Sequence, residues 1–158
     1  MMAMNILTAY YDSIIGCLKI TGTDNGILTV RFLETPPSQF PENPECLQEC
    51  VKQLDEYFRR MRTQFSLSLI PQGTAFEQEV WQQLLQIPFG ETTTYHHIAA
   101  ALGKPKGAQV VGRANGANPI AILIPCHRVI ASDGKLTGYA GGLWRKEWLL
   151  RHEGALIL

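Results

Sequence analysis

The sequence predicts an α/β protein of the α+β kind, with a small N-terminal β-meander and helix followed by a mostly helical C-terminal part. Apolar and polar residues alternate between turn signals over residues 5–34, and apolar residues recur at helical spacing over 47–61 and 76–87. Two short helical stretches flank a Gly-containing turn within 95–115. The chain has 158 residues, of which 46% are hydrophobic and 18% are charged, a composition typical of a soluble globular protein with one core or two small halves.

The first stretch, "NILTAYYDSIIGCLKITGTDNGILTVRFLE", has the period-two pattern of half-buried strands. Turn signals at Tyr11-Asp12-Ser13 and Asp24-Asn25-Gly26 divide it into the strands of a meander. A Pro-rich loop, Pro36 to Pro44, follows the last strand.

A helix is expected next, with Asn43 as its N-cap and Pro44 in its first position. One face of this helix carries apolar residues at helical spacing: Leu47, Cys50, Val51, Leu54, Phe58 and Met61. A short apolar segment, Phe65 to Ile70, then ends at Pro71-Gln72-Gly73. We place a domain boundary there, between an N-terminal domain of residues 1–71 and a C-terminal domain of residues 72–158.

The second domain opens with Thr74 and Glu77 at the spacing of a capping box. The helix that follows has one apolar face, made of Phe76, Val80, Trp81, Leu84, Leu85 and Ile87. Phe89-Gly90 is expected to end it.

A helix-turn-helix is predicted after that, with a helix from about Tyr95 to Leu102, a turn at Gly103 to Lys106, and a helix from about Gly107 to Asn115. Such units bind DNA or serve only as packing modules. The second helix is mostly small or apolar, and its only long polar side chains are Gln109 and Arg113. It cannot read a major groove through forked donors, but it can press its backbone into a narrow minor groove.

The apolar run "IAILI", Ile120 to Ile124, predicts a buried strand that ends at "PCHRV". Cys126 and His127 are adjacent there, and an imidazole can raise the thiolate fraction of a thiol directly or through one water. Glu153, which closes the helix "GLWRKEWLLRHE", is a candidate to orient that imidazole. The alternative is a buried structural cysteine beside a surface histidine.

Charge and cysteine content limit the other functional classes. The formal net charge is zero, which argues against DNA binding by bulk charge alone. Residues 1–71 carry 6 Lys and Arg against 8 Asp and Glu, and residues 72–158 carry 8 against 6, a weak asymmetry that gives slight support for a polyanion partner on the C-terminal half. Cys17, Cys46, Cys50 and Cys126 have no CxxC spacing, so we expect reduced thiols, and no nearby histidine or second cysteine pair completes a metal site with Cys46 and Cys50. The apolar runs are too short for a membrane span, and the N-terminus has no secretory signal, which together indicate a cytoplasmic protein.

Four motifs in order resemble the O6-alkylguanine-DNA alkyltransferase family, also called methylated-DNA–protein-cysteine methyltransferases. They are "NP", "IPCHRV", "GYAGG" and "RKEWLLRHEG", and the resemblance runs from about Thr74 to Gly154. It implies DNA repair by a single-turnover methyltransferase that flips an O6-alkylguanine out of double-stranded DNA and accepts the alkyl group on its own cysteine. O4-alkylthymine is a second possible substrate.

The resemblance also implies roles for individual residues. Cys126 would be the acceptor, His127 its base through a water, and Glu153 the residue that orients His127. Tyr95 would donate to guanine N3, and Asn118 would brace the turn before the active-site segment.

The guanine pocket and the DNA-binding surface follow from the same resemblance. The carbonyls of Cys126 and Val129 would accept from the exocyclic amine, and Tyr139, Ala140 and Gly141 would border the pocket. Arg128 is expected to form a structural ion pair. The helix that enters the minor groove would bind DNA through Gly107, Ala108, Gln109, Val110, Gly112 and Arg113.

One position departs from the family pattern, because Gln109 stands where the family usually has an intercalating arginine. Glutamine offers less stacking area and no charge, so we expect weaker binding and slower capture of lesions in duplex DNA. We expect a monomer that acts as a suicidal alkyltransferase. A lesion sensor that flips bases without repairing them, and a cysteine hydrolase of acyl groups, are the alternatives from other functional classes.

Overall fold

The structure, a computed structural model, describes residues 5–156 and consists of two compact units. The first unit comprises the residues up to Gln72 together with Pro119–Leu123, and the second comprises Gly73–Asn118 and the residues from Ile124 on. The α+β class, with a meander and helix followed by a mostly helical part, is confirmed. The division of the chain into domains of residues 1–71 and 72–158 remains a prediction.

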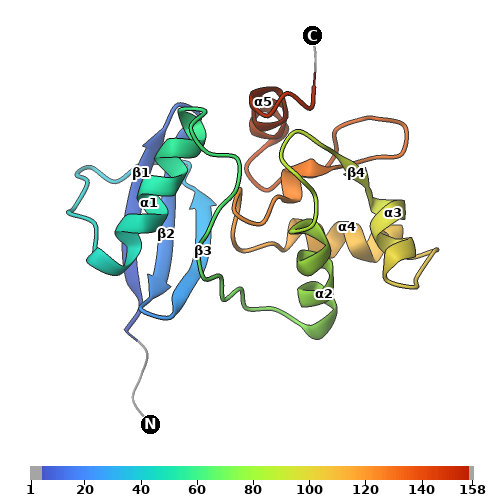
Figure 1. The fold of residues 1–158 in the computed structure, drawn as a ribbon, viewed down its shortest axis with the longest axis horizontal. Helices are drawn as coiled ribbons and strands as arrows, with labels where there is room; N and C mark the ends of the chain where they lie inside the picture. Colours follow the sequence, from blue (N-terminus) through green and yellow to red (C-terminus); the bar gives the residue numbers. More distant parts are fainter. Residues whose placement is uncertain (1–4, 157–158) are drawn as a thin grey trace. The chain divides into compact units, whose positions relative to one another are not determined.

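The first unit is built on an antiparallel sheet in the order β1-β2-β3, formed by β1 (Leu7–Ser13), β2 (Gly16–Thr23) and β3 (Gly26–Phe32) (Figure 1). The predicted turn at Asp24-Asn25 is confirmed. The predicted turn at Tyr11-Asp12-Ser13 is wrong, because these residues complete β1 and the chain turns at Ile14-Ile15. The Ser13 hydroxyl stabilises this turn, because it donates to the Gly16 carbonyl at 2.6 Å and accepts from Ile15 N–H at 3.2 Å.

Helix α1 (Glu45–Phe58) runs across one face of the sheet (Figure 1). Its N-cap is Pro44, not Asn43 as predicted, because the Asn43 side chain instead accepts a hydrogen bond from Tyr10 N–H in β1 at 3.1 Å. The helix also ends earlier than the apolar spacing predicts, and Met61 is 70% exposed. Its buried face packs on the sheet with Leu47, Cys50, Gln53, Leu54 and Tyr57.

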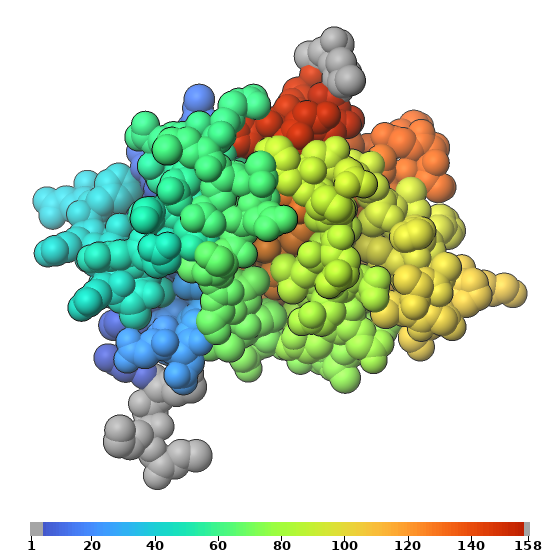
Figure 2. All heavy atoms as spheres, in the orientation of Figure 1, coloured from blue at the N-terminus to red at the C-terminus, as the bar shows by residue number. Residues whose placement is uncertain are grey.

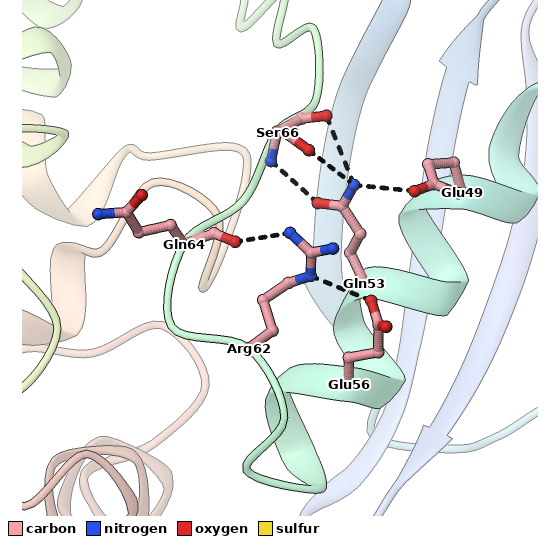
Figure 3. Close-up of polar contacts among 6 residues, drawn as sticks. All are labelled: Glu49, Gln53, Glu56, Arg62, Gln64 and Ser66. Carbon is pink, nitrogen blue, oxygen red and sulfur yellow. Dashed lines mark hydrogen bonds and ion pairs between the residues drawn. The ribbon is translucent and has the colours of Figure 1, made fainter.

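A polar cluster joins α1 to the segment that leaves it (Figure 3). The amide oxygen of buried Gln53 accepts from Ser66 N–H at 3.0 Å, and its amide nitrogen donates to Ser66 Oγ and Glu49. Arg62 pairs with Glu56 at 3.1 Å and donates to the Gln64 carbonyl. A buried amide needs these partners, so the cluster fixes the path of the extended segment.

The apolar run at Ile120–Ile124 is buried as predicted, but it is not a strand. It touches β3 only briefly, since Val30 N–H donates to the Pro119 carbonyl and Ala121 N–H donates to the Val30 carbonyl. Leu123 N–H then donates to the Ala121 carbonyl at 2.8 Å, and Ile122 has φ 71°, which together define a γ-turn of the rare positive-φ form. A β-branched residue in this region is strained, so packing has overridden local preference here.

The second unit contains α2 (Ala75–Leu84), β4 (Thr93–Thr94), α3 (Tyr95–Ala101), α4 (Ala108–Gly116), the 3₁₀ helix η1 (Cys126–Arg128), β5 (Val129–Ile130) and α5 (Leu143–His152). The predicted capping box of Thr74 and Glu77 is present. Helix α2 ends well before the predicted stop at Phe89-Gly90, because i→i+3 hydrogen bonds tighten the chain from Leu85 to Ile87. Within residues 5–156, every helix is too short or too polar to cross a bilayer.

Candidate active site

Cys126 begins η1, immediately after a second γ-turn. Pro125 has φ −82° and ψ 64°, and Cys126 N–H donates to the Ile124 carbonyl at 2.8 Å, the geometry of an inverse γ-turn. Arg128 N–H closes the 3₁₀ turn on the Pro125 carbonyl at 3.0 Å. Two tight turns, rather than a strand end, therefore hold the Cys-His-Arg segment in the interior of the second unit.

Glu153 lies at the C-terminus of α5 and joins two side chains of η1. One carboxylate oxygen is 2.8 Å from His127 Nε2, and Arg128 donates to both oxygens at 2.7 and 3.0 Å. Burial alone would raise the pKa of Glu153, but the hydrogen bonds and charges of His127 and Arg128 hold that pKa well below its usual range. Arg128 also donates to the Ile87 carbonyl at 2.6 Å, so it acts as the structural ion-pair residue that was expected.

This arrangement fixes the tautomer of His127. An ionised carboxylate can only accept, so Nε2 carries the proton and Nδ1 carries the lone pair. Burial lowers the pKa of His127 despite the neighbouring carboxylate, which keeps the ring neutral. Nδ1 is buried and has no hydrogen-bond partner among residues 5–156. The ring therefore presents a free basic nitrogen, oriented by Glu153.

Cys126 is buried, with 8% of the residue exposed. Burial raises the pKa of the Cys126 thiol, while a hydrogen bond from the Asn118 side chain and the charge of Lys146 act in the opposite direction. Asn118 also donates to the Ile124 carbonyl at 2.8 Å, which links the end of α4 to the residue before the Pro125 turn. The thiol is thus protonated at rest and lies among groups that favour its anion.

Tyr95 comes to the site through a short parallel pairing. Thr93 and Thr94 of β4 pair with Val129 and Ile130 of β5, which directly follow η1. Tyr95 is the first residue of α3, and its hydroxyl lies 3.2 Å from both the carbonyl and Oγ1 of Thr137. The structure therefore brings Tyr95 to the loop before Tyr139.

The predicted pocket residues divide into the end of η1 and the loop before α5. Burial raises the pKa of Tyr139 well above its usual value, and its hydroxyl is buried with no hydrogen-bond partner among the described residues. The Gly141 carbonyl accepts from Arg145 at 2.9 Å, and the adjacent Ala140 is exposed. The Val129 carbonyl accepts from Lys146 at 2.6 Å.

Two residues at this site were missed by sequence reasoning. Asn115, buried in α4, donates from Nδ2 to the Cys126 carbonyl at 3.3 Å. Lys146 is fully buried, and it stands at helical spacing with the buried Leu149 and Leu150. A charged residue on an apolar helix face was the signal that could have revealed Lys146.

The helix-turn-helix prediction matches the elements observed. Gly107 is the N-cap of α4. The buried face of α4 is formed by Val111, Ala114 and Asn115, and none of the predicted DNA-binding residues lies on it. Gln109, Val110 and Arg113 are exposed, while Gly107, Ala108 and Gly112 are partly exposed. The turn between α3 and α4, yellow in Figure 2, projects at the surface of the second unit.

Family models account for almost the whole chain. The model for the 6-O-methylguanine DNA methyltransferase ribonuclease-like domain matches residues 6–71, and the model for the DNA binding domain of the same family matches residues 75–155. A methylated-DNA–protein-cysteine methyltransferase of Methanosarcina barkeri is 47% identical over 152 residues, which cover 91% of this chain and 96% of the relative.

Solved structures agree with these matches. The crystal structure of Mycobacterium tuberculosis O6-methylguanine methyltransferase superposes with a TM-score of 0.86 at 42% identity, covering 96% of this chain and 94% of that one. Mycobacterium tuberculosis OGT in complex with DNA gives a TM-score of 0.85 at 45% identity, covering 94% and 92%. The resemblance drawn from the sequence is confirmed, and the chain belongs to the 6-O-methylguanine DNA methyltransferase family.

Proposed function

We propose that this chain repairs double-stranded DNA by moving the alkyl group of an O6-alkylguanine onto its own Cys126. Direct repair of alkylated DNA by a protein-cysteine methyltransferase is the activity of the family to which the chain belongs. The observation that supports Cys126 as the acceptor is its position beside His127, whose free Nδ1 is set by the bond of Nε2 to Glu153.

The proposed reaction begins with loss of the thiol proton. His127 Nδ1 takes the proton of Cys126 through one water, and Glu153 stabilises the resulting imidazolium. The thiolate then attacks the alkyl carbon, so that an S–C bond forms as the C–O6 bond breaks and its electron pair moves into the purine. Tyr95 donates toward N3, which neutralises the leaving guanine.

Recognition of the base is assigned to the backbone around η1 and the loop before α5. The carbonyls of Cys126 and Val129 accept from the exocyclic amine of guanine, while Tyr139, Ala140 and Gly141 border the base. An O4-alkylthymine lacks that amine, so we expect it to be the poorer substrate. The flipped base would reach this pocket while the outer face of α4 lies in the minor groove.

The thioether product explains why one molecule repairs one lesion. A thioether does not hydrolyse, so Cys126 is consumed by one transfer. The alkyl donor is the substrate itself, so the reaction needs no cofactor. A lesion sensor has no need of the acceptor thiol that Cys126 provides. A cysteine hydrolase would aim the N–H of its nucleophile at an oxyanion, whereas Cys126 N–H donates to the Ile124 carbonyl.

Single-turnover transfer from a duplex that contains one O6-methylguanine tests this proposal. His127→Ala should slow the appearance of restored guanine about a hundredfold or more, since general-base catalysis contributes that much. His97→Ala removes an exposed imidazole from α3 and serves as the matched control. Equal rates for His127→Ala and the unmodified protein would contradict the assigned base.

A further inference from the structure

Asn115 is a buried polar residue of α4 that the proposed reaction does not use. The buried face of this helix consists of Val111, Ala114 and Asn115, and Asn115 is 2% exposed. Its Nδ2 donates to the Cys126 carbonyl at 3.3 Å. Since a carbonyl oxygen can only accept, the amide is oriented with Nδ2 toward Cys126. Oδ1 is bonded to the same carbon as Nδ2, and it therefore lies beside the Cys126 carbonyl as a second acceptor.

The Oδ1 atom of Asn115 lacks a donor. It is buried and has no hydrogen-bond partner among residues 5–156, a property that it shares there with His127 Nδ1 and the Tyr139 hydroxyl. A buried acceptor without a partner is costly, so such an atom in a native structure needs an explanation. The role of His127 as the base explains its free Nδ1. The free Oδ1 of Asn115, next to the acceptor cysteine, indicates a donor that arrives with the substrate.

Asn115 and Tyr95 lie along the same side of α4. A Cβ built on Gly112 would be 3.8 Å from two carbons of the Tyr95 ring, so that ring packs against α4 at Gly112. Residues three apart share a helix face, which places Asn115 one turn beyond this contact. In the proposed reaction Tyr95 donates to guanine N3, and N3 and the exocyclic amine are bonded to the same carbon of the base. The free acceptor is thus one helical turn from the residue that binds the neighbouring atom.

The exocyclic amine is the donor that matches this acceptor. Alkylation at O6 removes the proton of N1, so the amine carries the only N–H groups of an O6-alkylguanine in DNA. The Cys126 carbonyl is already assigned to this amine, and Oδ1 lies next to that carbonyl. One N–H can be shared between two neighbouring acceptors in a bifurcated hydrogen bond.

We propose that Asn115 is a specificity-determining residue, whose Oδ1 accepts from the exocyclic amine of the flipped base together with the Cys126 carbonyl. This inference deepens the proposed function and rests on it for the position of the base. A base without the amine leaves Oδ1 buried and unpaired, so Asn115 discriminates against it. O4-alkylthymine and O6-methylhypoxanthine are such bases.

The test compares a duplex that contains O6-methylguanine with one that contains O6-methylhypoxanthine, which lacks only the exocyclic amine. Asn115→Leu removes both polar atoms at a similar side-chain size, and Asn115→Asp keeps an acceptor at Oδ1. The readout is the ratio of the single-turnover transfer rates from the two duplexes, in which a general loss of activity cancels. Asn115→Leu should lower this ratio about five- to tenfold, the effect of one lost hydrogen bond, whereas Asn115→Asp should retain most of it. Asn25→Leu, at an exposed turn after β2, is the control and should leave the ratio unchanged.

An unchanged ratio in folded Asn115→Leu would overturn the proposal, because Asn115 would then serve only to position Cys126. If Asn115→Leu does not fold, Asn115→Ala provides the same comparison. Binding of the two duplexes to proteins that carry Cys126→Ser, which cannot form the thioether, is a second measurement. There Asn115→Leu should reduce the preference for the O6-methylguanine duplex by a similar factor. A preference that depends on Asn115, without transfer in the unmodified protein, would count against the proposed function alone, and a preference that does not depend on Asn115 would overturn this proposal.

Discussion

The Glu153 carboxylate keeps its charge without any exposed surface, because His127 and Arg128 share it. These three buried side chains explain how the His127 imidazole stays neutral and oriented at the position next to Cys126. The adjacent Cys-His pair and the carboxylate at the helix end were predictable, since each lies in a short sequence motif. Asn115 was not, because a polar residue becomes part of a site only when tertiary packing places it there, and Lys146 was indicated only by its position on an apolar helix face.

Glu153→Gln should remove the charge that balances Arg128 and weaken the bond to His127. Loss of one partner from a buried ion pair costs about 3–5 kcal/mol in the free energy of unfolding, and methyl transfer should fall with it. Urea unfolding and single-turnover rates measure the two effects. Glu147→Gln breaks the partly exposed pair with Arg151 and should cost about 1 kcal/mol or less. Equal losses of stability in the two variants would contradict the account of Glu153.

Gln109→Arg should strengthen capture of lesions in duplex DNA. An exposed arginine that stacks on an aromatic face contributes about 0.5–1 kcal/mol, which corresponds to a gain of about two- to fivefold in affinity or rate. The free base O6-methylguanine leaves no gap in a base stack that a side chain has to fill. The rate of its reaction, which is slower than that of duplex DNA, should therefore hardly change. Binding titrations and rates on both substrates measure the difference. The hypothesis fails if Gln109→Arg leaves duplex affinity and repair rate unchanged.

At the scale of elements, periodicity predicted the helices well and the apolar run before Cys126 poorly. Helix faces depend on spacing within one segment, and the capping box of Thr74 and Glu77 is local too. The β-branched run at Ile120–Ile124 indicates burial, but a strand also needs a partner along its length. β3 offers only a brief contact, and the chain instead makes γ-turns at Ile122 and Pro125.

Trp81 joins α2 to α4, which carries the proposed DNA-binding face. Its indole N–H donates to the Ala114 carbonyl at 2.8 Å, and the residue is 1% exposed. Trp81→Phe should lower the free energy of unfolding by about 1 kcal/mol through the lost hydrogen bond. Trp81→Ala should lower it by about 3–5 kcal/mol through the cavity. Leu85→Ala changes an exposed position just after α2 and is the control. Chemical denaturation measures the loss of unfolding free energy, and equal losses in Leu85→Ala and Trp81→Ala would contradict this interpretation.

At the scale of the whole molecule, the segment at Pro119–Leu123 groups with the first unit, although the residues on either side of it belong to the second. Ile120, Ile122 and Leu123 are buried, and the backbone groups of Pro119 and Ala121 form hydrogen bonds with Val30 of β3. Composition and turn signals indicated a boundary near Pro71, but no local pattern reveals a five-residue segment that packs elsewhere.

A fragment of residues 72–158 should therefore be less stable than the same residues in the full chain, although we propose these residues as a domain. It lacks β3, so at least three apolar side chains lose burial, each of which contributes about 1.5–3 kcal/mol. Circular dichroism during urea titration, with light scattering for aggregation, compares the two proteins. A fragment that unfolds at the midpoint of the full chain would show that the segment does not depend on β3.

The central claim is that Cys126 accepts the alkyl group from DNA and keeps it. The most direct measurement is the intact mass of the protein after incubation with excess duplex DNA that contains O6-methylguanine. The account predicts a gain of one methyl group per molecule, abolished in Cys126→Ala and retained in Cys46→Ala. No gain, or a gain that persists in Cys126→Ala, would contradict it.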